Sequence, residues 1–289
     1  MAVLLLALLA LQLFDHGSAK LLDTNCAPFV EYGLRIIGGE DAQNFYTPWI
    51  ASLYNSTKDF RGAGTLIHKR FVLTCAHVLQ GNPEFVRLGE KDRSCITSNC
   101  SVVKEYSVDL AIKHPDYFFQ FPVHKNDVAI LKLNVDVEYN EFIKPICIIV
   151  DEEVNLADIN QIQAFGWGIT QAHKKKASDT LKTINLQLQS PLECLRSVQV
   201  NSTDEQFCAR SPTGGDTCYG DSGGPVAGNY MYEGQSRYVQ MGIVSFGSLS
   251  CNKSAIYTNV TSHRNWILTV LQTHGRQLLL GLETFPGVN

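Results

Sequence analysis

The sequence lacks the features that mark a nucleic-acid-binding protein. Its 289 residues carry 24 Lys and Arg against 28 Asp and Glu, giving a net charge of −4. No basic stripe and no alternation of basic with aromatic residues occurs, so the chain is not expected to bind nucleic acid. Internal repeats and low-complexity linkers are also absent. With 45% hydrophobic residues, the chain can bury a sizeable core in one or two domains.

Only one long apolar run is present, "MAVLLLALLALQLF" at residues 1–14. The run is too short to span a bilayer, and Gly17 and Ala19 are spaced for cleavage after Ala19, which predicts a signal peptide over residues 1–19. No Lys or Arg precedes the run, and a buried N-terminal helix is the alternative. Because no second run of this kind follows, we expect a secreted, extracellular protein that does not span a membrane.

Secretion changes how the nine cysteines are interpreted. Outside the cell most cysteines form disulfides, and an odd number leaves at least one unpaired. Five Asn-x-Ser/Thr triplets are present, and in a secreted chain several of them should be glycosylated. The triplet at Asn99 is the poorest candidate, because Cys100 is its middle residue. The other four begin at Asn55, Asn201, Asn252 and Asn259.

Short β-like runs at close spacing predict an all-β protein. These runs are "FVLT" (71–74), "VAILKL" (128–133), "QIQAFG" (161–166), "YVQMGIVSF" (238–246) and "AIYTNV" (255–260). Gly, Pro, Asn and Asp lie in the gaps between them, and this pattern favours a barrel or a sandwich.

One helix is predicted near the C-terminus, in "SHRNWILTVLQTH" at residues 262–274. Trp266, Ile267, Val270 and Leu271 fall on one helical face, and Ser262 is a suitable N-cap. Residues 276–289 show no clear period and are assigned only as a tail.

Three stretches carry residues suited to acyl transfer: His77 in "TCAHV", Asp127 in "HKNDVAILKL" and Ser222 in "GDTCYGDSGGPV". Each alone has a plain structural interpretation, as a core histidine, a strand-edge aspartate or a turn serine. Together they supply a nucleophile, a base and a carboxylate. A Ser hydroxyl is a poor nucleophile until a base takes its proton, and the base needs a carboxylate to hold its tautomer.

At this point the chain resembles the chymotrypsin-like (trypsin-type) serine protease family, whose triad is a standard template. The resemblance covers about residues 26–272 and rests on "LTCAHV", "NDVAILKL", "FGWG", "GDSGGP" and "IVSFG". The run "GAGTLIHKRFVLT" and the Cys95–Cys100 loop resemble insect secreted members. The resemblance implies two antiparallel six-stranded β-barrels and a C-terminal α-helix, with the protease domain over residues 36–275.

The resemblance also implies roles for the site residues. His77 would be the general base and then the acid, Asp127 would orient it, and Ser222 would be the nucleophile. The backbone N–H groups of Gly220 and Ser222 would form the oxyanion hole.

The stretch "GLRIIGG" resembles the family's activation site. Residues 20–35 would be an activation leader, and cleavage after Arg35 would free the amine of Ile36 to pair with Asp221. An ammonium and a carboxylate buried together are tolerable, whereas either alone is costly. The intact chain would therefore be a zymogen that needs an upstream activating protease.

Substrate preference also follows from the resemblance. Asp216 would lie at the base of the primary specificity pocket and pair with Arg or Lys of the substrate. Ser245, Phe246 and Gly247 would contact the substrate backbone. Ala255 departs from the Gly that trypsin-like members usually have, and its methyl group is expected to narrow the pocket.

The resemblance suggests four disulfides: Cys26–Cys147, Cys95–Cys100, Cys194–Cys208 and Cys218–Cys251. Two common bridges of the family are missing as whole pairs, at Gly62 and Val78 and at Ile162 and Gly228. Cys75 is left over. A zinc site there would need ligands that the neighbouring sequence does not supply. We predict a buried thiol that acts as a small hydrophobe, with an intermolecular disulfide as the alternative.

Hydrolysis by this family requires no cofactor. Glu90, Asp92 and Glu105 flank the Cys95–Cys100 loop and could bind calcium, or they could form a solvated acidic loop. The expected partners are protein substrates and serpin-type inhibitors. The sequence thus predicts a secreted endopeptidase that cleaves after Arg or Lys. The alternative is a catalytically weak homologue that acts as a binding or regulatory protein in an extracellular cascade.

Overall fold

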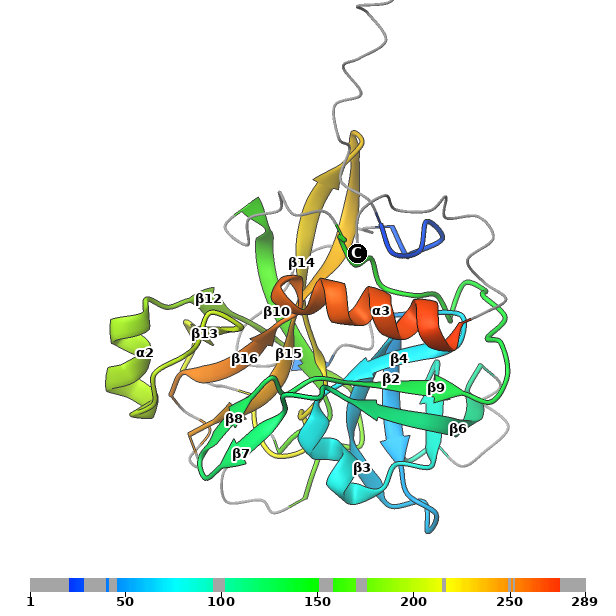
Figure 1. Cartoon of the computed structure of the whole chain (residues 1–289), viewed down its shortest axis with the longest axis horizontal. Helices are drawn as coiled ribbons and strands as arrows, with labels where there is room; N and C mark the ends of the chain where they lie inside the picture. The colour runs from blue at the N-terminus through cyan, green and yellow to red at the C-terminus, as the bar shows by residue number, and fades with distance from the viewer. Residues whose placement is uncertain are drawn as a thin grey trace, which may run out of the picture.

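The structure is a computed structural model (Figure 1) that describes residues 21–28, 40–41, 46–95, 102–150, 158–169, 176–214, 217–248, 251 and 253–275. The predicted signal peptide and C-terminal tail lie outside these residues. Within the described residues, no helix is both long and apolar enough to cross a membrane.

The first half of the chain forms a closed six-stranded barrel in the order β2-β3-β4-β9-β6-β5. Its strands are β2 (Ile50–Tyr54), β3 (Phe60–His68), β4 (Phe71–Thr74), β5 (Phe85–Leu88), β6 (Lys104–Lys113) and β9 (Ala129–Leu133). The runs predicted at 71–74 and 128–133 become β4 and β9, which pair antiparallel from Phe71 and Lys132 to Thr74 and Ala129. All four residues of β4 are buried, which explains why this strand has no polar alternation.

The second half forms an eight-stranded sheet in the order β1-β11-β10-β14-β15-β16-β13-β12. Its strands are β1 (Glu40–Asp41), β10 (Asn160–Gly166), β11 (Lys182–Asn185), β12 (Gln187–Leu188), β13 (Gln206–Arg210), β14 (Pro225–Tyr232), β15 (Gln235–Gly247) and β16 (Ala255–Asn259). Only Leu186 separates β11 from β12, and its N–H donates to the Ile162 carbonyl at 2.8 Å. The end strand β12 thus follows directly on β11, the second strand from the opposite end, and the sheet curls into a nearly closed barrel. The predicted double-barrel fold is confirmed. The second sheet has eight strands rather than six, because β1 adds an edge strand and the run 182–188 is divided into β11 and β12.

The C-terminal helix α3 (Arg264–His274) is confirmed, but its predicted N-cap is wrong. The short 3₁₀ turn η5 (Thr261–His263) precedes the helix, and His263 is its N-cap residue without a side-chain cap. The Ser262 hydroxyl instead donates to the Asp204 carbonyl. Ile267 and its buried neighbours on the helix join the core of the first barrel, and Figure 1 shows α3, in orange and red, lying across that half of the molecule.

A second helix, α2 (Pro191–Val198), was not predicted from the sequence. Ser190 is its N-cap, and its hydroxyl accepts from the Glu193 N–H. The Glu193 carboxylate accepts from the Ser190 N–H, which completes a capping box. A hairpin of β7 (Phe118–Gln120) and β8 (Val123–Lys125) also lies outside the predicted strands.

The leader segment packs against the stretch that connects the two barrels rather than extending into solvent. Cys26 is disulfide-bonded to Cys147. The Leu22 N–H donates to the Ile148 carbonyl at 2.8 Å, and the Ala27 N–H donates to the Pro145 carbonyl at 2.9 Å. Residues 21–28 are therefore an integral part of the packed structure.

Candidate active site

His77 lies where the buried strand β4 gives way to a short 3₁₀ helix, η2 (Ala76–Gly81). The Thr74 hydroxyl donates to the Ala63 carbonyl at 2.8 Å and fixes the end of the strand. Ala76 and Val78 are buried on either side of His77, whose side chain keeps 20% exposure. The packing of its neighbours thus holds the imidazole at the edge of the core, facing solvent.

Asp127 is fully buried beside His77. Its Oδ2 lies 2.7 Å from Nδ1 of His77, and its Oδ1 accepts from the His77 backbone N–H at 2.9 Å. The Ser245 hydroxyl donates to the same Oδ2 at 2.5 Å. Burial alone would raise the pKa of Asp127, but the hydrogen bonds and charge of His77 together with the Ser245 hydroxyl bring it below its usual value. The carboxylate is therefore ionised and fixes the orientation of the imidazole.

Ser222 lies in the tight turn before β14. The next residue, Gly223, has a φ of +81°, and a Cβ there would collide with the Thr74 hydroxyl and the Ala63 carbonyl. The Ser222 carbonyl accepts from the Ala63 N–H at 2.9 Å, which ties the turn to β3. The turn therefore needs glycine for two reasons, a left-handed backbone and a close approach to the first barrel.

A cleft of about 870 Å³ contains several of the predicted catalytic and substrate-contacting residues. Its lining includes His77, Ser222, Gly220, Ser245, Phe246 and Gly247. Within the described residues, no hydrogen bond joins Ser222 to His77. The nearest polar contact of His77 Nε2 is the Cys75 sulfur, at 3.7 Å. The cleft therefore contains His77 and Ser222, while Asp127 is buried behind His77 and Cys75 lies beside the base.

Asp221 is half-buried, and its carboxylate is closely surrounded by backbone. Oδ1 accepts from the Gly168 N–H at 2.7 Å, and Oδ2 accepts from the Cys218 N–H at 2.8 Å. A Cβ at Gly166 or Gly168 would collide with this carboxylate. The dense surroundings raise the pKa of Asp221 to about 6 despite the two N–H donors. Arg35 and Ile36 lie outside the described residues.

Only some of the predicted substrate-binding residues line the cleft. Asp216 lies outside the described residues. Phe246 and Gly247 line the cleft, while the Ser245 hydroxyl is turned to Asp127, a contact that the sequence did not predict. Ala255 pairs with Gly247 in the sheet and belongs to the core of the second barrel.

One wall of the cleft is aromatic, and sequence reasoning missed it. His124 stacks on Phe119 with ring centres 4.6 Å apart and lies 5.6 Å from the Phe246 ring. Its Nδ1 lies 3.0 Å from the Tyr117 hydroxyl. The aromatic run before the Asp127 motif was the available signal in the sequence.

The structure contains three of the disulfides that the resemblance suggested: Cys26–Cys147, Cys194–Cys208 and Cys218–Cys251. Cys95 is also disulfide-bonded, and Cys100 lies outside the described residues. Cys75 is free and fully buried. At one missing bridge, a Cβ on Gly62 would lie 3.0 Å from Val78 Cγ2, so the valine fills that space.

The glycosylation candidates differ in exposure. Asn201 is exposed, while Asn55 and Asn259 are half-buried. The Asn259 side-chain oxygen accepts from the N–H and the hydroxyl of Thr261. Asn252 lies outside the described residues. Asn201 is the most accessible of the three that the structure describes.

The proposed calcium ligands do not form an open oxygen cage. Arg87 donates to Glu90 at 3.1 Å and to Glu105 at 2.9 Å, and Lys58 lies 2.5 Å from Glu105. Asp92 accepts from the N–H and the hydroxyl of Ser94. Because a guanidinium joins the two glutamates, these residues do not fit a calcium ion as they stand.

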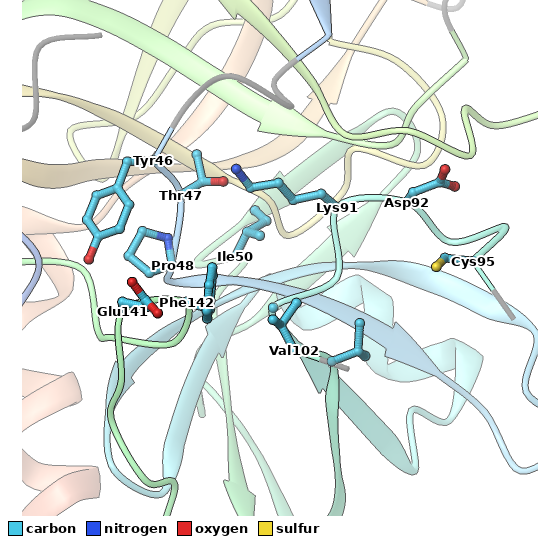
Figure 2. A pocket seen from close by; sticks show the side chains of 12 residues that line it. Tyr46, Thr47, Pro48, Ile50, Lys91, Asp92, Cys95, Val102, Glu141 and Phe142 are labelled. Carbon is cyan, nitrogen blue, oxygen red and sulfur yellow. The ribbon is translucent and has the colours of Figure 1, made fainter. Parts of the chain in front are cut away.

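Next to this acidic loop is a second cavity of about 300 Å³, away from the triad. Figure 2 shows Lys91 extending toward Thr47, with Asp92 and Cys95 at the far end of the cavity. Its floor is largely apolar, with Pro48, Ile50 and Phe142 among the lining residues. None of the triad residues lines this cavity.

Comparison with known proteins agrees with the geometry. The family model described as Trypsin matches residues 36–267. CLIP domain-containing serine protease B15 of Anopheles gambiae is 33% identical over 259 residues, covering 82% of this chain and 70% of that protein. Melanization protease 1 of Drosophila melanogaster is 31% identical over 277 residues, covering 84% and 66%. The Clotting factor G beta subunit of Tachypleus tridentatus is 32% identical over 274 residues, covering 87% and 84%. The chain belongs to the trypsin family of serine proteases.

Proposed function

We propose that this protein is a serine endopeptidase that uses His77, Asp127 and Ser222. The observation that carries the proposal is the buried Asp127 carboxylate, held 2.7 Å from Nδ1 of His77, in a cleft that also contains Ser222. A buried carboxylate bonded to one imidazole nitrogen leaves the other nitrogen to accept a proton from a nucleophile.

In this mechanism His77 Nε2 takes the proton of the Ser222 hydroxyl as its oxygen attacks the scissile carbonyl carbon. The carbonyl π-electrons move onto oxygen, where the N–H groups of Gly220 and Ser222 stabilise the negative charge. Collapse of this intermediate breaks the C–N bond, and His77 gives its proton to the departing amine. Water then repeats the two steps on the acyl-enzyme and releases the acid product. Asp127 stabilises the imidazolium at each stage.

The intact chain is proposed to be a zymogen that an upstream protease cleaves after Arg35. The state of Asp221 supports this. Its carboxylate is enclosed by backbone and accepts from two N–H groups, and its pKa is raised to about 6, which shows an unfavourable setting for the charge. The Ile36 ammonium would supply the cation that this carboxylate lacks among the described residues.

We propose cleavage of protein substrates after Arg or Lys, with Asp216 as the acidic partner. Ala255 is proposed to narrow the pocket only through its neighbour Gly247, because the alanine itself lies in the core. Two relatives are named for melanization and clotting, which supports a place in an extracellular cascade, with serpin-type inhibitors as partners. Secretion and glycosylation, foremost at Asn201, complete this proposal.

The second candidate is a catalytically weak homologue that acts as a binding or regulatory protein. One observation favours it: among the described residues, His77 Nε2 contacts the Cys75 sulfur at 3.7 Å and makes no hydrogen bond to Ser222. Catalytic hydrogen bonds are often long before substrate binds, so the lack of a Ser222–His77 bond is compatible with a working triad.

Labelling with a fluorophosphonate separates the two candidates. The chain cleaved after Arg35 should take one covalent label at Ser222, identified by peptide mass spectrometry. Ser222→Ala is the matched control and should take none. If the cleaved wild-type chain remains unlabelled although it is folded, the endopeptidase proposal is wrong and the homologue proposal stands.

A further inference from the structure

The contact between the Cys75 sulfur and His77 Nε2 has no role in the proposed mechanism. Cys75 is free, fully buried and in contact with the imidazole nitrogen that must accept the serine proton. The Cys75 sulfur, a ring nitrogen of His77 and a carboxylate oxygen of Asp127 all lie within 4.8 Å of one another. A thiol and an imidazole side by side are the donor types that zinc prefers in proteins.

The distance between the two donor atoms suits a tetrahedral ion. The Cys75 sulfur and His77 Nε2 are 3.7 Å apart. An ion with a metal–sulfur bond of about 2.3 Å and a metal–nitrogen bond of about 2.05 Å would span this distance at an S–metal–N angle of about 115°. This angle is close to tetrahedral, so the separation of the two atoms suits one shared ion.

Asp127 would act on such an ion through charge rather than by ligation. Its two oxygens already accept from Nδ1 and the backbone N–H of His77 and from the Ser245 hydroxyl. The bond from Nδ1 holds the ring so that Nε2 presents its lone pair, as carboxylates do for zinc-binding histidines. His77 also lines the cleft, from which the ion would enter, and water would supply the ligands that the neighbouring sequence lacks.

We propose that Cys75 and His77 form a binding site for a zinc-class cation, and that occupation of this site inhibits the enzyme. The ion would bind the Nε2 lone pair that takes the proton from Ser222, and it would displace the proton of the Cys75 thiol to solvent. The inhibition rests on the proposed serine protease function, whereas the binding does not. Burial raises the pKa of Cys75, so the site is expected to be empty until the free ion is supplied in excess.

A rival site would use the two histidines of the cleft instead. The His77 and His124 rings have centres 4.9 Å apart, and His124 Nδ1 contacts the Tyr117 hydroxyl. The two sites differ in one measurable respect, because only the first has a sulfur ligand.

Binding is tested by titrating the uncleaved, untagged full chain with Co²⁺ and recording the sulfur-to-cobalt charge-transfer band in the near ultraviolet. We expect a band that saturates at one ion per chain and is lost in both Cys75→Ala and Cys75→Ser. The serine variant retains the size of the side chain, and circular dichroism checks its fold. His124→Gln should retain the band. Absence of the band in the wild-type chain, or its persistence in either Cys75 variant, would overturn the proposal.

Inhibition is tested on the chain cleaved after Arg35, as the ratio of peptide-amide hydrolysis rates without and with Zn²⁺. We expect at least a tenfold ratio for the wild type and less than twofold for Cys75→Ser, with recovery on chelation. A ratio that falls in His124→Gln but persists in Cys75→Ser would assign the ion to the two histidines and overturn the proposal. If the cleaved chain has no activity, the cobalt band still decides whether the ion binds.

Discussion

Two aspartates flank the cleft, and the structure treats their charges in opposite ways. Asp127, from the first barrel, is fully buried, yet its pKa is lowered because His77 and Ser245 bond to it. Asp221, from the second barrel, is only half-buried, yet its pKa is raised to about 6 because two backbone N–H groups do not offset its enclosed setting. The His77 half of the site thus has its electrostatic partners, while the Ser222 half has no cation beside Asp221 among the residues that the structure describes.

This difference explains how a zymogen can hold a formed His–Asp pair and still be inactive. Asp127 already has its partners, His77 of the first barrel and Ser245 of β15 in the second, so cleavage is expected to add nothing there. Asp221 adjoins Ser222 and lies three residues after Cys218 of the specificity region, so a change in its partner is expected to act on the nucleophile and the pocket together. Activation chemistry is therefore expected to affect the second barrel alone.

The largest expected effect comes from changing Asp127, whose half of the site already has its electrostatic partners. Asp127→Asn should lower kcat of the cleaved chain by about 10⁴-fold, the size of this change in the Ser-His-Asp template, because the imidazole loses its tautomer control. Hydrolysis of a peptide-amide substrate measures it. Ser245→Ala removes one bond to the same carboxylate and should cost about tenfold or less. Equal losses in both variants would mean that Asp127 acts only through the fold.

Next in size is the loss of the activating cleavage. Arg35→Gln should leave the chain at least about 10²–10³-fold less active after treatment with the activating protease, the cost of a missing oxyanion donor. N-terminal sequencing of the active wild-type form should read "IIGGED". Full activity in the uncleaved variant would show that the chain is not a zymogen.

The two aspartates should also give opposite dependences of stability on pH. Because the pKa of Asp221 is raised in the folded chain, its contribution is fully present below about pH 4 and is lost as the pH rises through about 6. We expect about 2 kcal/mol or less from this group in the uncleaved chain, since the residue is partly exposed. Asp127, with a lowered pKa, contributes stability that is lost on acidification.

Denaturant unfolding of the uncleaved chain between pH 4 and pH 7 measures the Asp221 contribution. Asp221→Asn is the control and should flatten the dependence in this window. The chain cleaved after Arg35 should also show a weaker dependence, because the Ile36 amine now pairs with the carboxylate. A slope that is the same in all three proteins would show that Asp221 has its usual pKa.

The smallest expected effect is on stability in Cys75→Ala. The side chain is buried and close to Ala in size, so the free energy of unfolding should change by about 1 kcal/mol or less. In the wild-type chain, alkylation of Cys75 should be slow until the protein unfolds, because burial raises its pKa. Differential alkylation with mass spectrometry tests this, and rapid labelling of the native chain would mean that the thiol is accessible.

The elements that sequence reasoning found are those with dense apolar runs. The stretch "FVLT" becomes β4 without a shift because all four residues are buried in one barrel. The helix α2 was missed because it is only eight residues long, although Ser190 and Glu193 have capping-box spacing. Ser262 was wrongly assigned as a cap because a 3₁₀ turn moves the N-cap of α3 by one residue, to His263.

The candidate site also has features that the sequence predicts and features that it does not. The types and order of His77, Asp127 and Ser222 could be predicted because the chemistry demands them. The Ser245–Asp127 bond joins residues 118 positions apart, and the Cys75–His77 contact depends on side-chain rotamers at a bend. The link from Arg87 to Glu90 and Glu105, which opposes a calcium site, depends on the pairing of β5 with β6. No local pattern in the sequence carries these contacts.

The attachment of the leader has a practical consequence for following activation. Residues 21–28 are joined to the connection between the two barrels by the Cys26–Cys147 disulfide and by backbone hydrogen bonds at Leu22 and Ala27. A cut after Arg35 would therefore release no fragment, and the molecule would keep its mass, apart from one added water, and its migration on a non-reducing gel. Only reduction would separate a short peptide from the catalytic chain. An assay that looks for a loss of size without reductant would score the active enzyme as precursor.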